Sequence, residues 1–297
     1  MQKILDMAIK RSEVGESSAG GYRVKGRALP YENYMENAAW NECYANMQKN
    51  HEKAFAAYGA GGGKELDERV SGTNTYPPKM ASYGSSSRMI YTLMQNEENF
   101  EYEKKLPTLV GGVANLDGFA ALAEKCVFVE AKCREPYGAK SDLVSDKYEA
   151  LYQYLTGKDD KVLTCNCVPA GKGKLAVSFL VGENKLKLEH FDMKQMLCHL
   201  LGIGVAYLRG EYEKKIDFIY LLYNPNGLPF DKEAHRKKIM DIYAKECAEF
   251  ESVDFTTLFY HVLCYLTQVE KLEYVQEPEQ LKALFSARMC DQHTMNL

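Results

Sequence analysis

The chain has 297 residues, of which 46% are hydrophobic and 26% are charged, and its formal net charge is −4 at pH 7. These values are ordinary for a globular protein with a sizeable core. The negative balance argues against a protein that coats nucleic acid through bulk electrostatics. The longest apolar run, near residues 218–223, has the length of a buried strand, so no membrane-spanning segment is expected.

The nine cysteines are scattered along the chain, and their number is odd. Several of them, including Cys126, Cys198 and Cys264, lie within apolar segments and are typical of small buried hydrophobic residues. A disulfide framework is unexpected in a chain of this size, and the N-terminal segment lacks the apolar core of a signal peptide. We therefore expect a cytoplasmic protein with reduced thiols.

Residues 1–83 are predicted to form an N-terminal extension of helices and loops that packs on the core. A short helix is expected over residues 1–13, and a longer one from Pro30 to about Tyr58. The glycine-rich stretch 59–63 resembles a phosphate-binding loop only superficially, because the required glycine and hydroxyl residue are missing. It is interpreted as a helix terminator, followed by a polar, turn-rich segment over 64–83.

Residues 84–230 are predicted to form an α/β core, with a long insertion over 133–190. Serines 85–87 can cap a helix, and apolar residues then recur at helical spacing. The elements expected in chain order are a helix over 85–96, a strand over 100–106, two strands within 107–132, a helix over 142–155, a hairpin over 161–181, a helix over 192–208 and a strand over 216–223. This order fits a mixed sheet flanked by helices.

The C-terminal region, 231–297, is predicted to be helical, with helices over about 231–250, 254–270 and 277–288. The overall expectation is therefore an α/β protein with helical additions at both ends of the chain.

Two neighbouring apolar runs carry the most informative residues of the chain. Asp117 ends the first run, and the second run carries Glu130 and Lys132 at its far end. Alternate residues of a strand share a face, so Glu130 and Lys132 point the same way. If the two runs pair as a hairpin, Asp117 is brought opposite them. Two carboxylates beside a lysine suit a hard divalent cation poised for phosphodiester chemistry.

A plainer interpretation is that these charges only terminate apolar runs at the surface, as acid-x-lysine sequences commonly do. Asp117 argues against it, because it follows Asn115 and Leu116 inside an apolar run. A charge in that position costs desolvation free energy unless it is paired or bound to a cation.

The sequences Asn115-Leu116-Asp117-Gly118-Phe119 and Val129-Glu130-Ala131-Lys132 resemble the PD-(D/E)xK nuclease superfamily, with the restriction-endonuclease-like fold. The likeness is to a bacterial branch of that superfamily and covers roughly residues 84–226. It implies an α-β-β-β-α-β core, with one acid on the second strand and the acid-x-lysine on the third. The chain departs from the pattern in having no proline before Asp117 and an unusually long insertion.

The resemblance implies a Mg²⁺-dependent nuclease, with Mn²⁺ as a substitute, that acts on nucleic acid, most naturally DNA. Asp117 and Glu130 would be metal ligands, together with a backbone carbonyl such as that of Ala131. Lys132 stays protonated beside two carboxylates, which favours electrostatic stabilisation over a role as general base.

Supporting residues are also implied. Glu98, at the end of the first helix, and Glu135, just after Lys132, are candidates to assist the metal site. On the second helix Gln195 is the candidate to face the site, whereas His199, one turn further on, is typical of a core histidine.

Phosphate contacts are expected from basic residues outside this cluster: Arg88, Lys172 and Lys174. A homodimer is compatible with the resemblance. Two alternatives stay open, namely a non-catalytic module that keeps the fold to bind nucleic acid or protein, and an unrelated α/β protein in which residues 117–132 form an ordinary hairpin. Cys165 and Cys167 have the spacing of half a zinc site, but no second pair is suitably placed.

Overall fold

The computed structural model describes most of the chain, in twelve stretches. These are residues 23–24, 27–28, 34–35, 37–61, 63–71, 74–82, 84–133, 135–137, 142–156, 162–226, 233–270 and 278–295. The helix expected over residues 1–13 lies outside the described residues. Within them, no helix is long and apolar enough to cross a membrane.

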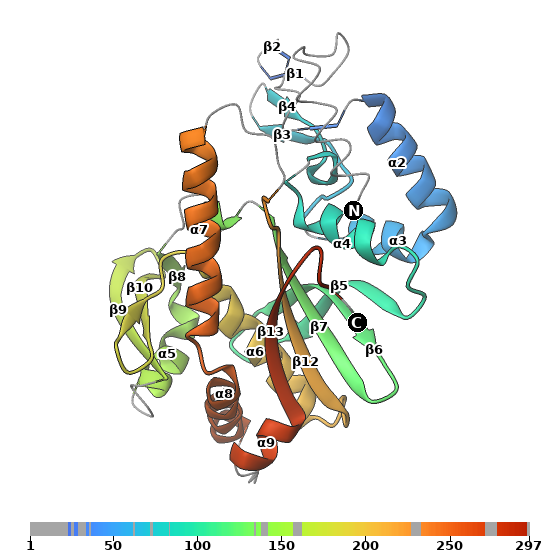
Figure 1. Ribbon diagram of the computed structural model, residues 1–297. Coiled ribbons are helices and arrows are strands. Elements are labelled where there is room, and N and C mark those ends of the chain that lie inside the picture. The colour runs from blue at the N-terminus through green and yellow to red at the C-terminus, as the bar shows by residue number, and fades with distance from the viewer. Residues whose placement is uncertain are drawn as a thin grey trace.

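A mixed five-stranded sheet forms the centre of the molecule, in the order β13-β12-β7-β6-β5 (Figure 1). Its strands are β5 (Phe100–Pro107), β6 (Val113–Ala121), β7 (Lys125–Lys132), β12 (Lys215–Leu222) and β13 (Phe285–Asp291). The first three strands form an antiparallel meander, and β7, β12 and β13 run parallel to one another. The general α/β class with a mixed central sheet is therefore confirmed.

Both faces of the sheet are covered, which explains why its central strands are continuous apolar runs. Alternate residues of β7 enter different cores: Phe128 belongs to the core under α6 (Met193–Leu208), and Val127 and Val129 belong to the core under α4 (Ser86–Met94). The helix α8 (Phe255–Glu270) packs against α6 on the same side. The sheet thus fixes which residues of β7 face α6.

The long insertion between β7 and α6 forms a second, smaller sheet of strands β8, β9, β10 and β11. Its elements are η3 (Glu135–Tyr137), β8 (Leu143–Ser145), η4 (Asp146–Tyr148), α5 (Glu149–Thr156), β9 (Leu163–Gly171), β10 (Lys174–Val181) and β11 (Leu186–Lys187). The hairpin expected over 161–181 is confirmed as β9 and β10. The helix expected over 142–155 is only partly correct, because residues 143–145 pair with β10 and the helix begins later.

The C-terminal region contains α7 (Glu233–Glu251), α8 and α9 (Pro278–Leu284), and it ends in a strand. The helix predicted over 277–288 is wrong from Phe285 onward, because residues 285–291 form β13. This strand pairs in parallel with β12 and gives its otherwise open edge hydrogen-bonding partners. The prediction of a purely helical C-terminal region is therefore incorrect, and this region completes the central sheet.

The N-terminal part covers the α4 side of the sheet and also departs from expectation. The long predicted helix is divided at His51 into α2 (Asn37–Asn50) and α3 (Glu52–Ala60). The expected loop over 64–83 contains a hairpin of β3 (Arg69–Ser71) and β4 (Asn74–Tyr76), then η2 (Lys79–Ala81). Short strands β1 (Arg23–Val24) and β2 (Arg27–Ala28) precede them.

Candidate functional site

The candidate site lies where strands β6 and β7 stop pairing. Their antiparallel ladder ends at the pair Gly118–Val129, one residue short of Asp117 and Glu130. Beyond that point the carboxylate Oδ2 of Asp117 accepts a hydrogen bond from the backbone N–H of Ala131, at 2.7 Å. The side chain of Asp117 is therefore held against the backbone that links Glu130 to Lys132.

Strand β5 is irregular beside the same point. Tyr102 pairs with Gly118 and Lys104 pairs with Leu116, so Glu103 is the residue opposite Asp117 that takes no regular place in the ladder. Glu103 has a φ of 55°, which is uncommon for a residue with a side chain. This irregularity lies opposite Asp117, in the middle of β6, and adds a further acidic residue to this part of the sheet.

Glu130 and Lys132 share the face of β7 that is covered by α6. They are only 3% and 5% exposed, and Lys132 Nζ lies 2.5 Å from Glu130 Oε1. Buried charges of this kind are tolerated when they are paired and hydrogen-bonded.

Helix α6 contributes two more polar side chains from its first two turns. Its N-cap residue Asp192 accepts a hydrogen bond from the backbone N–H of Gln195, which fixes the start of the helix. The side chain Oε1 of Gln195 accepts a hydrogen bond from Lys132 Nζ. His199, one turn further along the same face, places Nε2 3.0 Å from Glu130 Oε2.

The charges of the buried pair stabilise each other. Burial raises the pKa of Glu130, but Lys132 and His199 outweigh this effect and lower the pKa to about 2. Burial likewise lowers the pKa of Lys132, and the attraction of Glu130 and Asp117 outweighs it, so that the pKa is raised. Glu130 is therefore ionised and Lys132 protonated at neutral pH.

The pKa of Asp117 is shifted in the direction opposite to that of Glu130. Its burial, followed by repulsion from Glu130, raises its pKa well above the ordinary value, although Lys132 and the Ala131 amide oppose this shift. Burial and repulsion from Glu65 and Glu130 also raise the pKa of Glu103, to about 7. The site thus gathers acidic groups whose burial and mutual repulsion raise the pKa of two of them, Asp117 and Glu103.

The two acidic residues predicted to support the metal site, Glu135 and Glu98, do not both lie beside it. Glu135 lies in η3, where its Oε2 accepts a hydrogen bond from the backbone N–H of Cys133, and its charge raises the pKa of Lys132. Glu98 is exposed in the turn between α4 and β5, and its carbonyl accepts a hydrogen bond from Lys53. No contact within the described residues joins Glu98 to Glu130.

The basic residues expected to contact phosphate lie on two different parts of the structure, the helix α4 and the insertion. Arg88 is 5% exposed on α4, so the structure places this predicted phosphate contact in the interior. Lys172 and Lys174 are exposed at the turn between β9 and β10, within the insertion.

Several polar residues near the site are not predicted from the sequence. Tyr220 is the neighbour of Glu130 in the parallel pair β7–β12, and its hydroxyl donates a hydrogen bond to Glu246 of α7 at 2.6 Å. Glu249, also on α7, accepts hydrogen bonds from three successive backbone N–H groups, those of residues 189–191, at 2.8 to 3.1 Å. The spacing of Gln195 and His199 by four residues is the signal that could have indicated His199.

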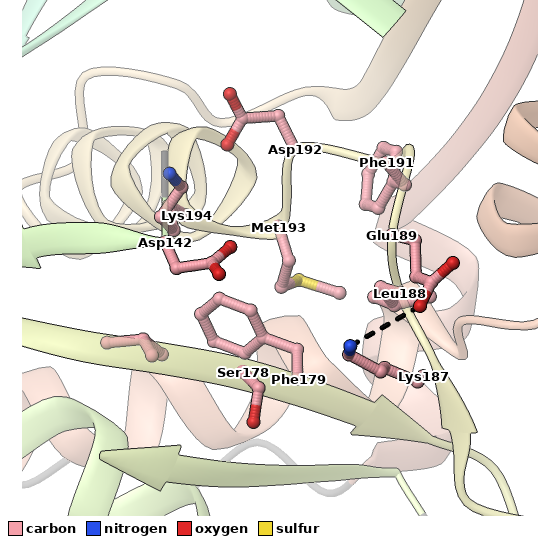
Figure 2. A pocket seen from close by; sticks show the side chains of 11 residues that line it. Asp142, Ser178, Phe179, Lys187, Leu188, Glu189, Phe191, Asp192, Met193 and Lys194 are labelled. Atoms are coloured by element: carbon pink, nitrogen blue, oxygen red, sulfur yellow. Dashed lines mark ion pairs between the residues drawn. The ribbon is translucent and has the colours of Figure 1, made fainter. Parts of the chain in front are cut away.

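A pocket of about 240 Å³ adjoins the start of α6, between this helix and the second sheet (Figure 2). Phe179 and Met193 give it an apolar wall, and Asp142, Asp192 and Lys194 carry charges around it. Lys187 and Glu189 form an ion pair at 3.3 Å beside them. One of its lining residues, Lys194, immediately precedes Gln195 in α6.

Within the described part of the chain, no three His, Cys, Asp or Glu side chains are arranged as a ready-made metal site. The oxygens of Glu130 are directed at Lys132 and His199, and Asp117 is directed at a backbone amide. Cys165 and Cys167, whose sulfur atoms are 3.0 Å apart, are not part of such a group either.

Comparisons with known proteins give no assignment: no family model, curated protein or solved structure matches this chain.

Proposed function

We propose that this protein is a metal-dependent nuclease of the restriction-endonuclease-like type, which hydrolyses phosphodiester bonds and acts on DNA. The observation that carries the proposal is the convergence of Asp117, Glu130, Lys132 and Gln195 from β6, β7 and α6. These four residues come from three separate elements, and an ordinary surface hairpin gives no reason for them to meet in a buried place.

The order of elements supports the same proposal. Leaving out the insertion, the chain runs α4-β5-β6-β7-α6-β12, an α-β-β-β-α-β order. The first acid is on the second strand of this series and the acid-x-lysine is on the third, as the superfamily pattern requires.

The residues present suit a hard divalent cation such as Mg²⁺ or Mn²⁺. Carboxylate oxygens are the ligands these ions prefer, and the charge of Glu130 raises the pKa of Asp117, which a bound cation would oppose. In an extended strand the N–H and C=O of one residue point to the same side. The Ala131 carbonyl is therefore directed to the side of β7 on which Asp117 lies. When bound there, the cation would polarise the scissile phosphate and lower the pKa of a water molecule.

The side chains of the site would have different roles in the reaction. Lys132 is the buried cation that can stabilise negative charge on the phosphoryl oxygens. Gln195 holds the ammonium of Lys132 by accepting a hydrogen bond from it. Without a cation the pKa of Asp117 is raised, by burial and by repulsion from Glu130, and a cation held by Asp117 and Glu130 would oppose this rise.

The proposal is tested with the full chain and supercoiled plasmid, with Mg²⁺ or Mn²⁺ supplied in separate reactions. Asp117→Asn, Glu130→Gln and Lys132→Met are each expected to lower the cleavage rate by about 100- to 1,000-fold or more. Glu101→Gln is the matched control, because Glu101 is an exposed acid on β5 of the same sheet. Equal cleavage by all the variants would overturn the proposal.

A non-catalytic binding module is the second candidate. The observation that favours it is that the ions of Glu130 and Lys132 neutralise each other in a closed pair. Under this alternative the wild type cleaves neither DNA nor RNA and shows no Mn²⁺ binding that Glu130→Gln removes. Electron paramagnetic resonance of free Mn²⁺ measures that binding directly.

A further inference from the structure

We propose that His199 is a positioning residue that fixes the carboxylate of Glu130 from the side of α6. Its consequence for metal binding and cleavage rests on the proposed function. The imidazole Nε2 lies 3.0 Å from Glu130 Oε2, and the two side chains are both almost wholly buried.

The environment of His199 is not that of an ordinary core histidine. Buried polar atoms are nearly always hydrogen-bonded, yet both ring nitrogens of His199 and Oε2 of Glu130 lack any well-aligned hydrogen bond in the described structure. The Nε2–Oε2 approach is short, but it lies off the ideal direction of a hydrogen bond. The χ2 torsion of histidine is broad, so a small ring rotation would align the contact. The contact requires a proton on Nε2.

With this contact, each oxygen of the Glu130 carboxylate faces a different side chain. Lys132 binds Oε1 and His199 approaches Oε2, so the plane of the Glu130 carboxylate is fixed from both of its oxygens. Each carboxylate oxygen has two lone pairs, and one hydrogen bond to each leaves acceptor capacity for a cation. His199 therefore orients Glu130 and does not block it.

The position of His199 on α6 makes this role specific. Gln195 and His199 are four residues apart on one face of the helix, and they meet Lys132 and Glu130 respectively. One helix face thus contacts both members of the buried ion pair. A shift of α6 would disturb the cation and the carboxylate together.

Two variants separate orientation from packing. His199→Gln keeps an N–H donor at a reach similar to that of Nε2, whereas His199→Leu keeps apolar bulk and removes the donor. Loss of a group that hydrogen-bonds to a metal ligand typically weakens metal binding by about 10- to 100-fold. We expect His199→Leu to weaken Mn²⁺ binding by this factor and His199→Gln to regain most of it. Electron paramagnetic resonance of free Mn²⁺ measures the affinity of each variant for Mn²⁺, and circular dichroism verifies that each variant is folded.

A metal-free measurement keeps the inference testable on its own. ¹⁵N NMR of protein labelled with ¹⁵N-histidine is expected to show that the proton of His199 is on Nε2. The signal of His199 is assigned by its absence in His199→Gln. Glu130→Gln should shift this signal. The inference is overturned if the proton is on Nδ1, if folded His199→Leu binds Mn²⁺ as the wild type does, or if both variants are weakened equally. If the wild type shows no Glu130-dependent Mn²⁺ binding while the NMR result holds, the nuclease proposal fails and the contact of His199 with Glu130 stands.

Discussion

Lys132 and Gln195 are 63 residues apart in the chain, yet the ammonium of the first donates a hydrogen bond to the side-chain carbonyl of the second. The second sheet is inserted between them and does not disturb the contact. The pairing of β7 with β12 and the packing of α6 on the sheet hold the two residues together. The site therefore depends on the central sheet, and the insertion adds a surface beside it.

Replacement of Gln195 tests this contact. Gln195→Ala leaves Lys132 without one of its two fixed partners, and the cleavage rate should fall by about 10- to 100-fold if the ammonium must be oriented. Plasmid cleavage under single-turnover conditions measures the change. Gln153→Ala is the matched control, since Gln153 is exposed on α5. A rate equal to that of the wild type would exclude a role for Gln195.

A double-mutant cycle measures how strongly the buried ion pair is coupled. Lys132→Met leaves Glu130 as a buried charge without its main partner and should lower the free energy of unfolding by about 3–5 kcal/mol. The combined Glu130→Gln and Lys132→Met variant should be less destabilised than the sum of its two single variants. Urea unfolding gives these free energies. The pair Glu101–Lys104 provides a control, where Glu101→Gln, at the exposed end of the pair, should change stability by less than about 1 kcal/mol.

Glu249 is predicted to anchor the segment that leads into α6. Glu249→Ala removes the acceptor of three backbone N–H groups, of which that of Phe191 is buried, and should destabilise the protein by about 1–3 kcal/mol, since an unsatisfied buried donor is costly. Glu249→Gln retains one carbonyl oxygen and should be milder. Glu251→Ala, at an exposed position on the same helix, should have little effect. Equal thermal unfolding of Glu249→Ala and Glu251→Ala would contradict the anchoring role.

The raised pKa of Glu103 predicts a pH dependence of stability. A carboxyl group whose pKa is raised in the folded state contributes most below its ordinary pKa, and this contribution is lost as the pH rises through the folded value of about 7. From pH 5 to pH 8 the wild type should therefore lose about 1–2 kcal/mol that Glu103→Gln does not lose, allowing for partial exposure to solvent. Urea unfolding at the two pH values measures this difference. A Glu103→Gln variant with the same pH profile as the wild type would refute it.

Close packing beside Asp117 gives a further prediction. A Cβ atom added at Gly118 would lie 2.0 Å from the ring of Phe100, so Gly118→Ala must move the ring or the strand. The expected cost is about 1–3 kcal/mol or more, as for other overpacked cores. Phe100→Leu should recover part of this loss in the double variant. Gly59→Ala is the control, because its nearest side-chain atom would be 4.0 Å away.

The sequence predicts the central strands well because their apolar runs are buried on both faces, as for residues 126–129 in β7. It also predicts that Glu130 and Lys132 share a face, since this follows from the period of a strand. Residues 285–288 are mispredicted as helix because they belong to a strand that is paired only with β12. His199 and Glu249 are missed for a similar reason: their polar contacts are with residues 69 and 58 to 60 positions away.

The parallel pairing of β13 with β12 has a consequence for the order of folding. Strand β12 lies between β7, which carries Glu130 and Lys132, and β13, which is made more than sixty residues later. During synthesis, one edge of β12 has no strand to pair with until residue 291 has left the ribosome. The nascent protein therefore carries its buried charge cluster in an incomplete sheet while residues 223–291 are made, and the arrival of β13 covers the open edge of β12.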